Sequence, residues 1–183
     1  MTVQNRATIQ DLHRVRGKAE LVNGEIVHMS PTGDDPGYAG DEIHASLRAY
    51  ARRRKRGRAY SDNKAFRVHL PHRDSFSPDA AYHLGPRTGM EFLEGAPVFA
   101  AEVRSKGDYG PAAERAMAEK RADYFAAGTL VVWDVDLLSH DVVRVYRSTS
   151  PETPTVYRRG DTAEAEPAVP GWTMPVDDLF ASD

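Results

Sequence analysis

The spacing of apolar and polar residues divides the chain into predicted helices and strands. Apolar side chains recur at helical spacing over 38–56 and over 111–127, and Gly128 follows as a natural end of a helix. Two nearly continuous apolar runs, 97–103 and 129–133, predict buried strands. Shorter patterns predict a helix over 7–16 and strands over 58–61, 64–70, 78–83 and 142–146, the last antiparallel to 129–133 after a turn near Ser139.

Residues that favour turns separate these segments. The pair Asn23-Gly24 lies between two short apolar runs within 19–27. It predicts a hairpin, because a type I′ turn needs positive φ at both central residues. The segments 31–37 and 85–95 carry several Gly, Pro or acidic residues and predict loops.

The order of these elements predicts an α/β fold, in which helices flank a mixed β-sheet. We find no internal repeat and no linker, so the interpretation is a single domain over residues 1–183. Its core is expected to span about 19–147. The remaining segment, about 148–183, is rich in Pro and is expected to form a C-terminal tail with at most one short strand near 154–158.

Composition narrows the classes of function. The 183 residues carry a net charge of −3, so binding to nucleic acid would need a local basic patch. The absence of cysteine excludes disulfides and thiolate metal sites. Met1 to Arg16 is polar and lacks the apolar core of a signal peptide, and no apolar run is long enough for a membrane span. We therefore expect a cytoplasmic protein without a membrane partner.

Glu102 is the most unusual residue of the predicted buried strands. Its neighbours from Val98 to Ala101 and Val103 are all apolar. An ionised carboxylate there is costly unless it is paired or binds a metal ion. Alternation along the strand puts Ala100, Glu102 and Arg104 on one face. A structural salt bridge, from Glu102 to Arg104 or to another strand, is therefore the alternative to a role as a ligand.

Asp79 and Glu20 are two further acidic candidates whose positions are ordinary when taken alone. Asp79 follows Pro78 at the start of a short apolar strand, where an aspartate is commonly a turn residue. It gains interest from Glu102, because a loop and an adjacent strand could bring the two carboxylates together. Hairpin pairing would set Glu20 beside Val27, where the alternative is a solvated residue at an edge.

Lys120 lies in the middle of an apolar stripe on the predicted helix 111–127. At about 100° per residue, Lys120 shares one face with Ala113, Met117 and Tyr124. A cation at that position needs a buried acidic partner, or its ammonium group must reach water past small side chains. Because the helix follows the Glu102 strand directly, Lys120 is a candidate for a carboxylate site at the end of that strand.

A basic run follows the predicted helix 38–56. It carries six basic residues in seven positions: Arg52, Arg53, Arg54, Lys55, Arg56 and Arg58. One interpretation is a solvated helix end, where cations interact favourably with the helix dipole. The other, which we favour because the rest of the chain is acidic, is a patch that contacts phosphate groups of nucleic acid.

The order Pro-Asp, Glu within an apolar strand, then a helical Lys resembles the PD-(D/E)xK nuclease superfamily. More closely, the chain resembles the Uma-two family of predicted restriction endonucleases. The matching segments are Glu20-Leu21-Val22-Asn23-Gly24-Glu25-Ile26, Met29-Ser30-Pro31, Ser77-Pro78-Asp79, Ala101-Glu102-Val103-Arg104-Ser105, Lys120 with Tyr124, and Gly128 through Trp133 to Asp136. They extend from about residue 19 to 146, which is most of the chain.

This resemblance implies a restriction-endonuclease-like core and an endonuclease that hydrolyses phosphodiester bonds in DNA. It implies that Mg²⁺ or Mn²⁺ binds Asp79, Glu102 and the carbonyl of Val103. Lys120 is then the catalytic lysine, displaced from the strand to the helix, and Glu20 is a supporting catalytic carboxylate. The chain departs from the family at Gly40, where a His is usual, and at Arg104, where the family usually has an aliphatic residue and the superfamily has its strand lysine.

These residue types suit phosphodiester hydrolysis. Carboxylates hold a hard divalent cation that lowers the pKa of a bound water and polarises the phosphate, while a lysine orients that water or stabilises developing charge. The alternative is an inactive nucleic-acid-binding or assembly module with the same fold. The expected partner is nucleic acid, with double-stranded DNA favoured, and the oligomeric state stays open, a homodimer included.

Overall fold

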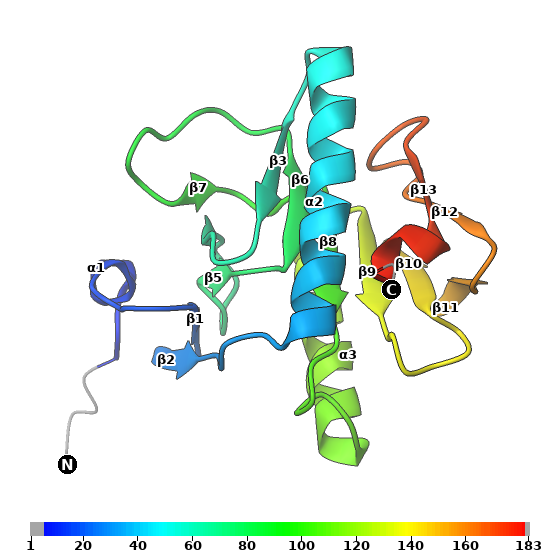
Figure 1. Ribbon diagram of the computed structural model, residues 1–183. Helices are drawn as coiled ribbons and strands as arrows, with labels where there is room; N and C mark the ends of the chain where they lie inside the picture. The colour runs from blue at the N-terminus through cyan, green and yellow to red at the C-terminus, as the bar shows by residue number, and fades with distance from the viewer. Residues whose placement is uncertain (1–5, 182–183) are drawn as a thin grey trace.

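The computed structural model describes residues 6–181 (Figure 1). Residues 1–5, part of the segment analysed above for a signal peptide, lie outside the described residues. The helices are α1 (Ile9–His13), α2 (Asp34–Arg54), α3 (Pro111–Ala126) and the 3-10 helix η1 (Val176–Leu179). The strands are β1 (Ala19–Val22), β2 (Glu25–His28), β3 (Arg58–Ser61), β4 (Phe66–Arg67), β5 (Ser75–Phe76), β6 (Ala80–His83), β7 (Leu93–Glu94), β8 (Phe99–Val103), β9 (Val131–Val135), β10 (Val143–Arg147), β11 (Ser150–Tyr157), β12 (Thr162–Glu164) and β13 (Thr173–Pro175).

A six-stranded sheet forms the centre of the molecule, with the order β11-β10-β9-β8-β6-β3. Strands β8 and β9 pair in parallel through the crossover helix α3, and the other neighbours are antiparallel. The predicted α/β fold with a mixed sheet is therefore confirmed, as is the antiparallel pairing of the strand after Ser139.

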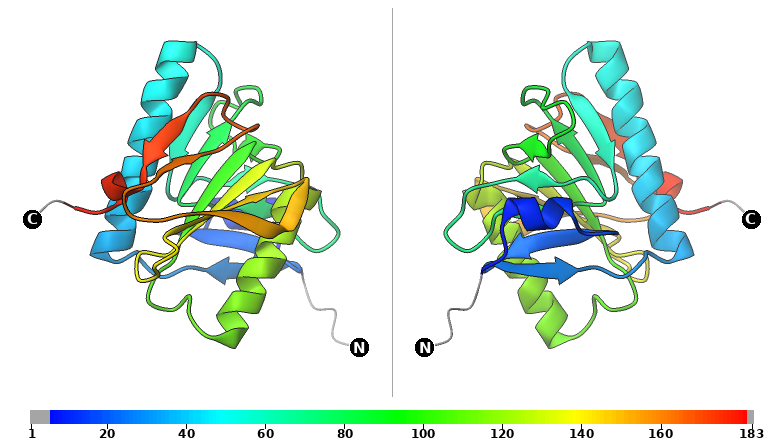
Figure 2. Two further views of the ribbon diagram at one scale, coloured as in Figure 1. Left: turned by 90° about the vertical axis from the view of Figure 1, so that its right-hand side faces the viewer. Right: turned by 90° about the vertical axis from the view of Figure 1, so that its left-hand side faces the viewer.

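The two faces of this sheet are covered by different parts of the chain. Ala101 and Trp133 face α2 and the C-terminal segment, where they join the larger apolar core. Ala100 and Val132 face the other side, where they pack with Tyr124 of α3 and with the small sheet β5-β4-β7. Figure 2 shows the C-terminal strands in front of the sheet in one view and the N-terminal hairpin in front of it in the opposite view.

The N-terminal hairpin forms as predicted. Strands β1 and β2 are joined by Asn23 and Gly24, whose φ angles are 54° and 75°. These values are those of a type I′ turn, which matches the twist of the flanking strands. The hairpin places Glu20 opposite Val27, also as predicted.

Helix α2 begins earlier than the hydrophobic pattern predicted. The segment 31–37 was expected to be a loop, but the helix starts at Asp34 and ends at Arg54. Two acidic residues in the first turn, Asp34 and Asp35, interact favourably with the helix dipole. Pro36 is tolerated there because N–H groups in the first turn have no partner within the helix.

The prediction for the C-terminal segment was wrong. Instead of one short strand, residues 148–183 contribute β11, β12, β13 and η1. Trp172, Met174, Val176 and Leu179 are each at most 2% exposed and belong to the larger core. The segment therefore closes one face of the sheet rather than trailing from it.

Several predicted boundaries and one loop also differ from the predictions; the helix expected over 7–16, for example, is Ile9–His13. The strand expected over 64–70 is only Phe66–Arg67. The strand expected over 129–133 runs from Val131 to Val135, and the backbone N–H of Thr129 is still bonded to Tyr124 at the end of α3. The loop expected over 85–95 contains the short strand β7. Within residues 6–181, no helix is long and apolar enough to cross a membrane.

Candidate functional site

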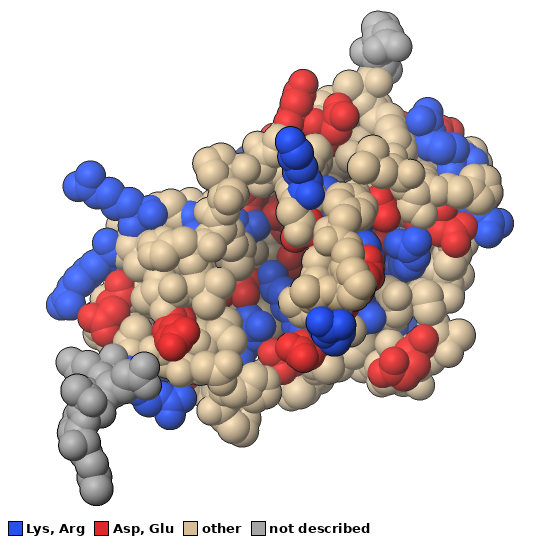
Figure 3. All heavy atoms as spheres, turned by 90° about the horizontal axis from the view of Figure 1, so that it is seen from below, with Lys and Arg blue, Asp and Glu red and all other residues tan. Residues whose placement is uncertain are grey.

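A cavity of about 460 Å³ opens between the hairpin, the ends of β6 and β8, and helix α3. In the view from below the molecule, a hollow near the centre of this face contains both acidic and basic side chains (Figure 3). The cavity is lined by Lys18, Glu20, Asp79, Glu102, Val103 and Lys120 among other residues. All four side chains predicted to carry the chemistry, together with Val103, thus line one concave surface.

The sheet register explains why the two central carboxylates are neighbours. Ala80 of β6 pairs with Ala101 of the antiparallel strand β8. Asp79, one residue before Ala80, is therefore opposite Glu102, one residue after Ala101. Opposite residues in an antiparallel pair extend to the same face of the sheet. That face is the one covered by α3.

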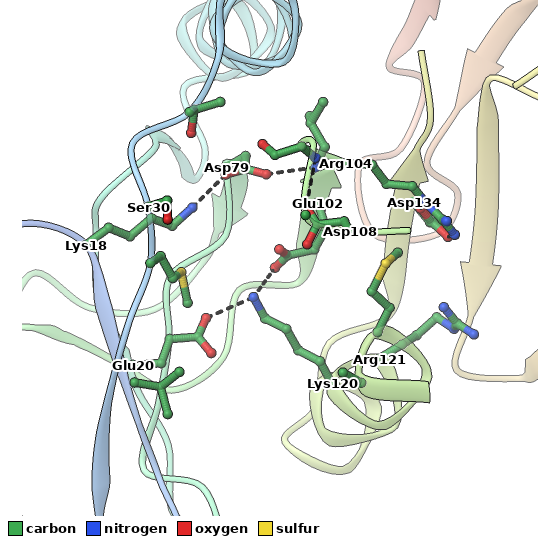
Figure 4. A pocket seen from close by; sticks show the side chains of 18 of the residues that line it. Lys18, Glu20, Ser30, Asp79, Glu102, Arg104, Asp108, Lys120, Arg121 and Asp134 are labelled. Atoms are coloured by element: carbon green, nitrogen blue, oxygen red, sulfur yellow. Dashed lines mark hydrogen bonds and ion pairs between the residues drawn. The ribbon is translucent and has the colours of Figure 1, made fainter. Parts of the chain in front are cut away.

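Lys120 connects two of the carboxylates. Its Nζ lies 2.9 Å from Oε1 of Glu20 and 2.9 Å from Oε1 of Glu102 (Figure 4). Tyr124, one helical turn further along α3, donates its hydroxyl proton to Glu102 Oε1 at 2.6 Å. The spacing of four residues puts Lys120 and Tyr124 on the same side of the helix, so both reach the carboxylate of Glu102.

Glu20 is buried rather than solvated. The residue is 3% exposed, and its Oε1 accepts the backbone N–H of Ser77 at 2.8 Å. Its Oε2 accepts a bond of 2.6 Å from Nη1 of Arg73, whose Nε donates to Asp123. With every carboxylate oxygen engaged, Glu20 is held in place and in turn holds Lys120.

Asp79 has a different set of partners. Its Oδ2 accepts the backbone N–H of Val103 at 2.7 Å, and its Oδ1 lies 2.6 Å from Nζ of Lys18. Lys18 also contacts Asp62, at 2.7 Å. A Cβ at Gly40 would lie 3.7 Å from the Cβ of Asp79, so the departure from the family pattern at Gly40 falls directly beside this carboxylate.

The two glutamates beside Lys120 have pKa values shifted in opposite directions. Burial raises the pKa of Glu102, and the carboxylates of Asp79 and Glu20 add to the rise while Lys120 opposes it. Burial also acts on Glu20, but Lys120 and Arg73 outweigh it and lower the pKa of Glu20. Burial alone would lower the pKa of Lys120, but the two glutamates raise it, so its ammonium stays charged.

The apolar stripe of α3 borders the open cavity and not a closed core. Ala116, Met117 and Tyr124, which flank Lys120 on this face of the helix, line the cavity, and of the three only Tyr124 is fully buried. The small side chains leave space in front of Lys120. Lys120 therefore neither inserts into a closed core nor extends past the alanines into bulk water.

Sequence reasoning missed Lys18 and Arg73. Lys18 could have been found, because it lies two residues before Glu20 and alternation places both on one face of the hairpin. Arg73 could not, because its contact with Glu20 depends on an isolated bridge between Val22 and Arg73. No local pattern around residue 73 predicts that bridge.

Arg104 does not pair with Glu102, which was the structural alternative for that glutamate. Its guanidinium instead makes two bonds of 2.8 Å to Asp134 and is also bonded to Glu114. Parallel pairing aligns Glu102 with Asp134, so Arg104, two residues after Glu102, reaches the neighbouring strand rather than its own. Arg104 is therefore paired with Asp134 and Glu114 and not with Glu102.

The predicted basic run lies away from the cavity. Ser30, Pro31 and Thr32, just before α2, line the cavity, whereas the run begins at the opposite end of this helix of 21 residues. At 1.5 Å per residue, the two ends are about 30 Å apart. The side chains of Arg52, Arg53 and Arg56 are exposed, and Arg54 and Arg58 also contact backbone carbonyls of Pro170 and Gly85.

The donor groups around Asp79 and Glu102 suit a hard divalent cation. Among the described residues, no group of three or more His, Cys, Asp or Glu side chains could hold a metal ion. Mg²⁺ does not need such a group, because it commonly binds one or two carboxylates and keeps several waters. The pair of carboxylates facing one cavity therefore fits Mg²⁺ or Mn²⁺ better than a cation that needs an all-protein cage.

Comparisons with known proteins agree with this architecture. A sequence profile of the Uma2 (Uma-two) family, described as "Putative restriction endonuclease", matches residues 9–177. A search of the curated proteins finds no match. The fold is similar to a crystal structure from Anabaena variabilis described as "a putative nuclease belonging to DUF820". The TM-score is 0.72 with 16% sequence identity, over 94% of this chain and 97% of that one. At this identity, the likeness establishes the fold.

Proposed function

This chain belongs to the Uma2 family, and from that premise we propose that it is a metal-dependent endonuclease that hydrolyses phosphodiester bonds in DNA. The observation that supports the proposal most is the convergence of Asp79, Glu102 and Lys120 on one cavity. Carboxylates and a cation in this arrangement supply the charge needed at a phosphoryl group in hydrolysis.

In this proposal, Asp79, Glu102 and the carbonyl of Val103 hold Mg²⁺ or Mn²⁺. When bound, the ion supplies a water of lowered pKa and polarises the scissile phosphate. The raised pKa of Glu102 supports a role for a cation here, because burial beside other carboxylates makes its ionised form unfavourable without further positive charge.

The other groups act on position and charge. Lys120, held by Glu20 and Glu102, extends its ammonium into the cavity, where it orients the attacking water or stabilises negative charge on the phosphoryl oxygens. Tyr124 fixes the carboxylate of Glu102 by a hydrogen bond. Burial and the carboxylate of Glu102 keep the pKa of Tyr124 well above its usual value, so the hydroxyl remains a donor.

The proposed site is tested by cleavage of labelled double-stranded DNA under single-turnover conditions with Mg²⁺ or Mn²⁺. We expect the wild-type chain to cleave, chelation to stop the reaction, and Asp79→Asn to abolish it. Asp74→Asn, outside the cavity lining, is the matched control and should cleave normally. If the wild-type chain binds DNA but never cleaves DNA or RNA with either metal, the alternative, a binding or assembly module, is the better interpretation.

We also propose that the basic run contacts the DNA backbone. A separation of about 30 Å from the cavity corresponds to about nine base pairs at 3.4 Å each, so one duplex could reach both places. Neutralising Arg52, Arg53 and Arg56 should weaken binding to all sequences alike. It should also flatten the log–log salt dependence by roughly one unit per lost contact. Unchanged affinity at low salt would leave these arginines as a solvated helix end.

A further inference from the structure

Lys18 occupies a position between two carboxylates at the edge of the cavity. Its Nζ lies 2.6 Å from Asp79 Oδ1 and 2.7 Å from Asp62 Oδ1 (Figure 4 shows the contact with Asp79). The side chain of Lys18 is 12% exposed, whereas that of Asp62, just after β3, is 42% exposed. An ammonium group has three donors, so it can serve both acceptors at once.

The contacts of Asp79 engage both of its carboxylate oxygens. Oδ2 accepts the backbone N–H of Val103, and Oδ1 carries the ammonium of Lys18. A cation that binds Asp79 would therefore share the carboxylate with Lys18, and one that binds Oδ1 would share that oxygen. Two positive charges on one oxygen repel each other strongly at such distances, particularly where water is partly excluded.

We propose that Lys18 is a positioning residue that competes with the metal ion for Asp79, and that Asp62 holds its ammonium while the metal is bound. This inference rests on the proposed metal site and deepens it by naming the residues that set its affinity. The contact with Asp62 allows Lys18 to leave Asp79 without losing all of its pairing. Lys18 thus weakens metal binding below the level that Asp79 and Glu102 alone would give, and Asp62 limits that effect.

The first test measures Mn²⁺ affinity of the full chain by calorimetry and by electron paramagnetic resonance at one fixed pH. Lys18→Met should bind Mn²⁺ about tenfold more tightly, the scale on which residues behind metal ligands change metal affinity. Lys18→Arg keeps a cation and should stay near wild type. Lys64→Met removes a neighbouring exposed lysine and is the matched control, with unchanged affinity. Unchanged or weaker binding by Lys18→Met overturns the proposal.

The second test asks whether Asp62 acts through Lys18 or attracts the metal ion directly. Asp62→Asn removes the alternative partner of Lys18 and should weaken Mn²⁺ binding by roughly threefold, as for a half-exposed ion pair. In the Lys18→Met background, the same change should have no effect, because the two residues act through one another. An equal loss in both backgrounds would mean that Asp62 attracts the metal directly, which contradicts the proposal.

These measurements distinguish failure of the inference from failure of the proposed nuclease. Tighter Mn²⁺ binding by Lys18→Met without cleavage by any variant would support the inference and reject the nuclease. Cleavage with no change in Mn²⁺ affinity would do the opposite. Circular dichroism checks that each variant is folded. If Lys18→Met is not folded, Lys18→Gln replaces it, and if neither is folded, unweakened binding by Asp62→Asn overturns the proposal.

Discussion

Two groups of cations and carboxylates lie side by side at the ends of β8 and β9, and they differ in how their carboxylates are stabilised. The Lys120 cluster consists of Glu20, Glu102, Lys120 and Tyr124. The Arg104 cluster consists of Arg104, Glu114 and Asp134. Strand pairing aligns Glu102 of the first cluster with Asp134 of the second, so the two share the same part of the sheet and both border the cavity.

In the Arg104 cluster, the planar cation fits its buried carboxylate, and the second carboxylate, Glu114, is half exposed to water. The planar guanidinium makes two parallel bonds to Asp134, which is the strongest arrangement for an arginine and a carboxylate. Its remaining donors reach Glu114, and the hydrogen bonds from Arg104 lower the pKa of Glu114. One cation therefore serves two carboxylates, but only Asp134 is buried, and both of its oxygens are bonded to the guanidinium, as expected of a structural ion pair.

In the Lys120 cluster, both carboxylates are less exposed to water than Glu114. One ammonium serves two glutamates, and Asp79 adds a third carboxylate nearby. The pKa of Glu102 is raised in spite of Lys120, whereas the pKa of Glu114 is lowered by its cation. Neighbouring clusters of similar composition can thus be told apart by the pKa of a carboxylate. It is raised at Glu102, beside the cavity, where the cation does not offset burial and the other carboxylates.

Lys120→Met is expected to have the largest effect, because it removes the only cation that contacts Glu102 among the described residues. Turnover should fall by roughly 10²-fold or more, as for the loss of one preorganised electrostatic group. Without metal, the unpaired carboxylates should also cost about 3–5 kcal/mol of stability. Added Mg²⁺ should restore part of that stability by binding the native state.

Single-turnover cleavage and melting temperature with and without Mg²⁺ check this prediction. Methionine is similar in length to the apolar stem of lysine, so the packing within the apolar stripe of α3 is preserved. If Lys120→Met cleaves at the wild-type rate and is only less stable, the two clusters are of the same structural kind and the comparison fails. Attention would then move to Arg104 and Lys106 as the cations that act in catalysis.

Asp134→Asn is the corresponding change in the Arg104 cluster. It breaks a buried pair but leaves Glu114 on the guanidinium, so we expect a loss of about 3 kcal/mol, at the lower end of the range for such pairs. Mn²⁺ affinity and the cleavage rate of the folded fraction should stay near wild type. Denaturant unfolding measures the loss, and a stable variant with impaired metal binding would contradict the assignment of a structural role.

Glu102→Gln should separate chemistry from stability. The amide keeps the size of the side chain and can still accept the hydroxyl of Tyr124, but it cannot provide an anionic ligand. We expect cleavage to fall by about 10²-fold or more and Mn²⁺ binding to weaken. Stability should not fall, since the ionised form of Glu102 is unfavourable in the fold. Cleavage at the wild-type rate would exclude Glu102 as a ligand.

Much of the fold was predictable because its signals are local. The Asn23-Gly24 turn, the apolar run of β8 and the helical spacing of α3 each depend on a few adjacent residues, and each appears as predicted with small shifts at its ends. The start of α2 was misjudged because Pro and Gly were taken as loop residues, although Asp34, Asp35 and Pro36 are all favourable in a first helical turn.

The C-terminal layer was not predictable from local patterns. Trp172 and Met174 stand among Pro and Gly residues with no clear period, and their burial depends on distant partners. The indole N–H of Trp172, for example, bonds to Ser46 of α2 at 3.0 Å. A contact across so many residues leaves no trace in the spacing of its own segment, so composition alone suggested a tail.

The residues of the candidate site also divide into those with a local signal in the sequence and those without one. Glu102 and Lys120 were noticed because a charged residue in an apolar pattern is a local anomaly. Lys18 and Arg73 lie in polar segments, where a cation is unremarkable. Alternation along the hairpin places Lys18 on the same face as Glu20. Its contact with Asp79, and that of Arg73 with Glu20, form only when the hairpin, the segment before β5 and the edge of β6 come together in the tertiary structure.

The smallest expected effect compares the two glutamates of the Lys120 cluster with each other, by the pH dependence of stability in metal-free buffer. The pKa of Glu102 is raised in the fold, so the native state holds its proton longer than the unfolded chain. Stability then falls as pH rises from the ordinary value of a glutamate through the raised pKa of Glu102. Glu102→Gln should therefore gain stability relative to wild type across that interval.

Glu20 has the opposite sign, because its pKa is lowered in the fold. Its contribution is present above the ordinary value of a glutamate and is lost as pH falls through the lowered pKa. Glu20→Gln should therefore be less stable than wild type at neutral pH, and the difference should shrink on acidification. Urea unfolding of both variants between pH 3 and pH 7, a range chosen about the reference glutamate pKa, measures the two trends. Parallel trends would mean that Lys120 stabilises the ionised forms of both glutamates equally. A raised pKa of Glu102 would then no longer separate this cluster from the Arg104 cluster.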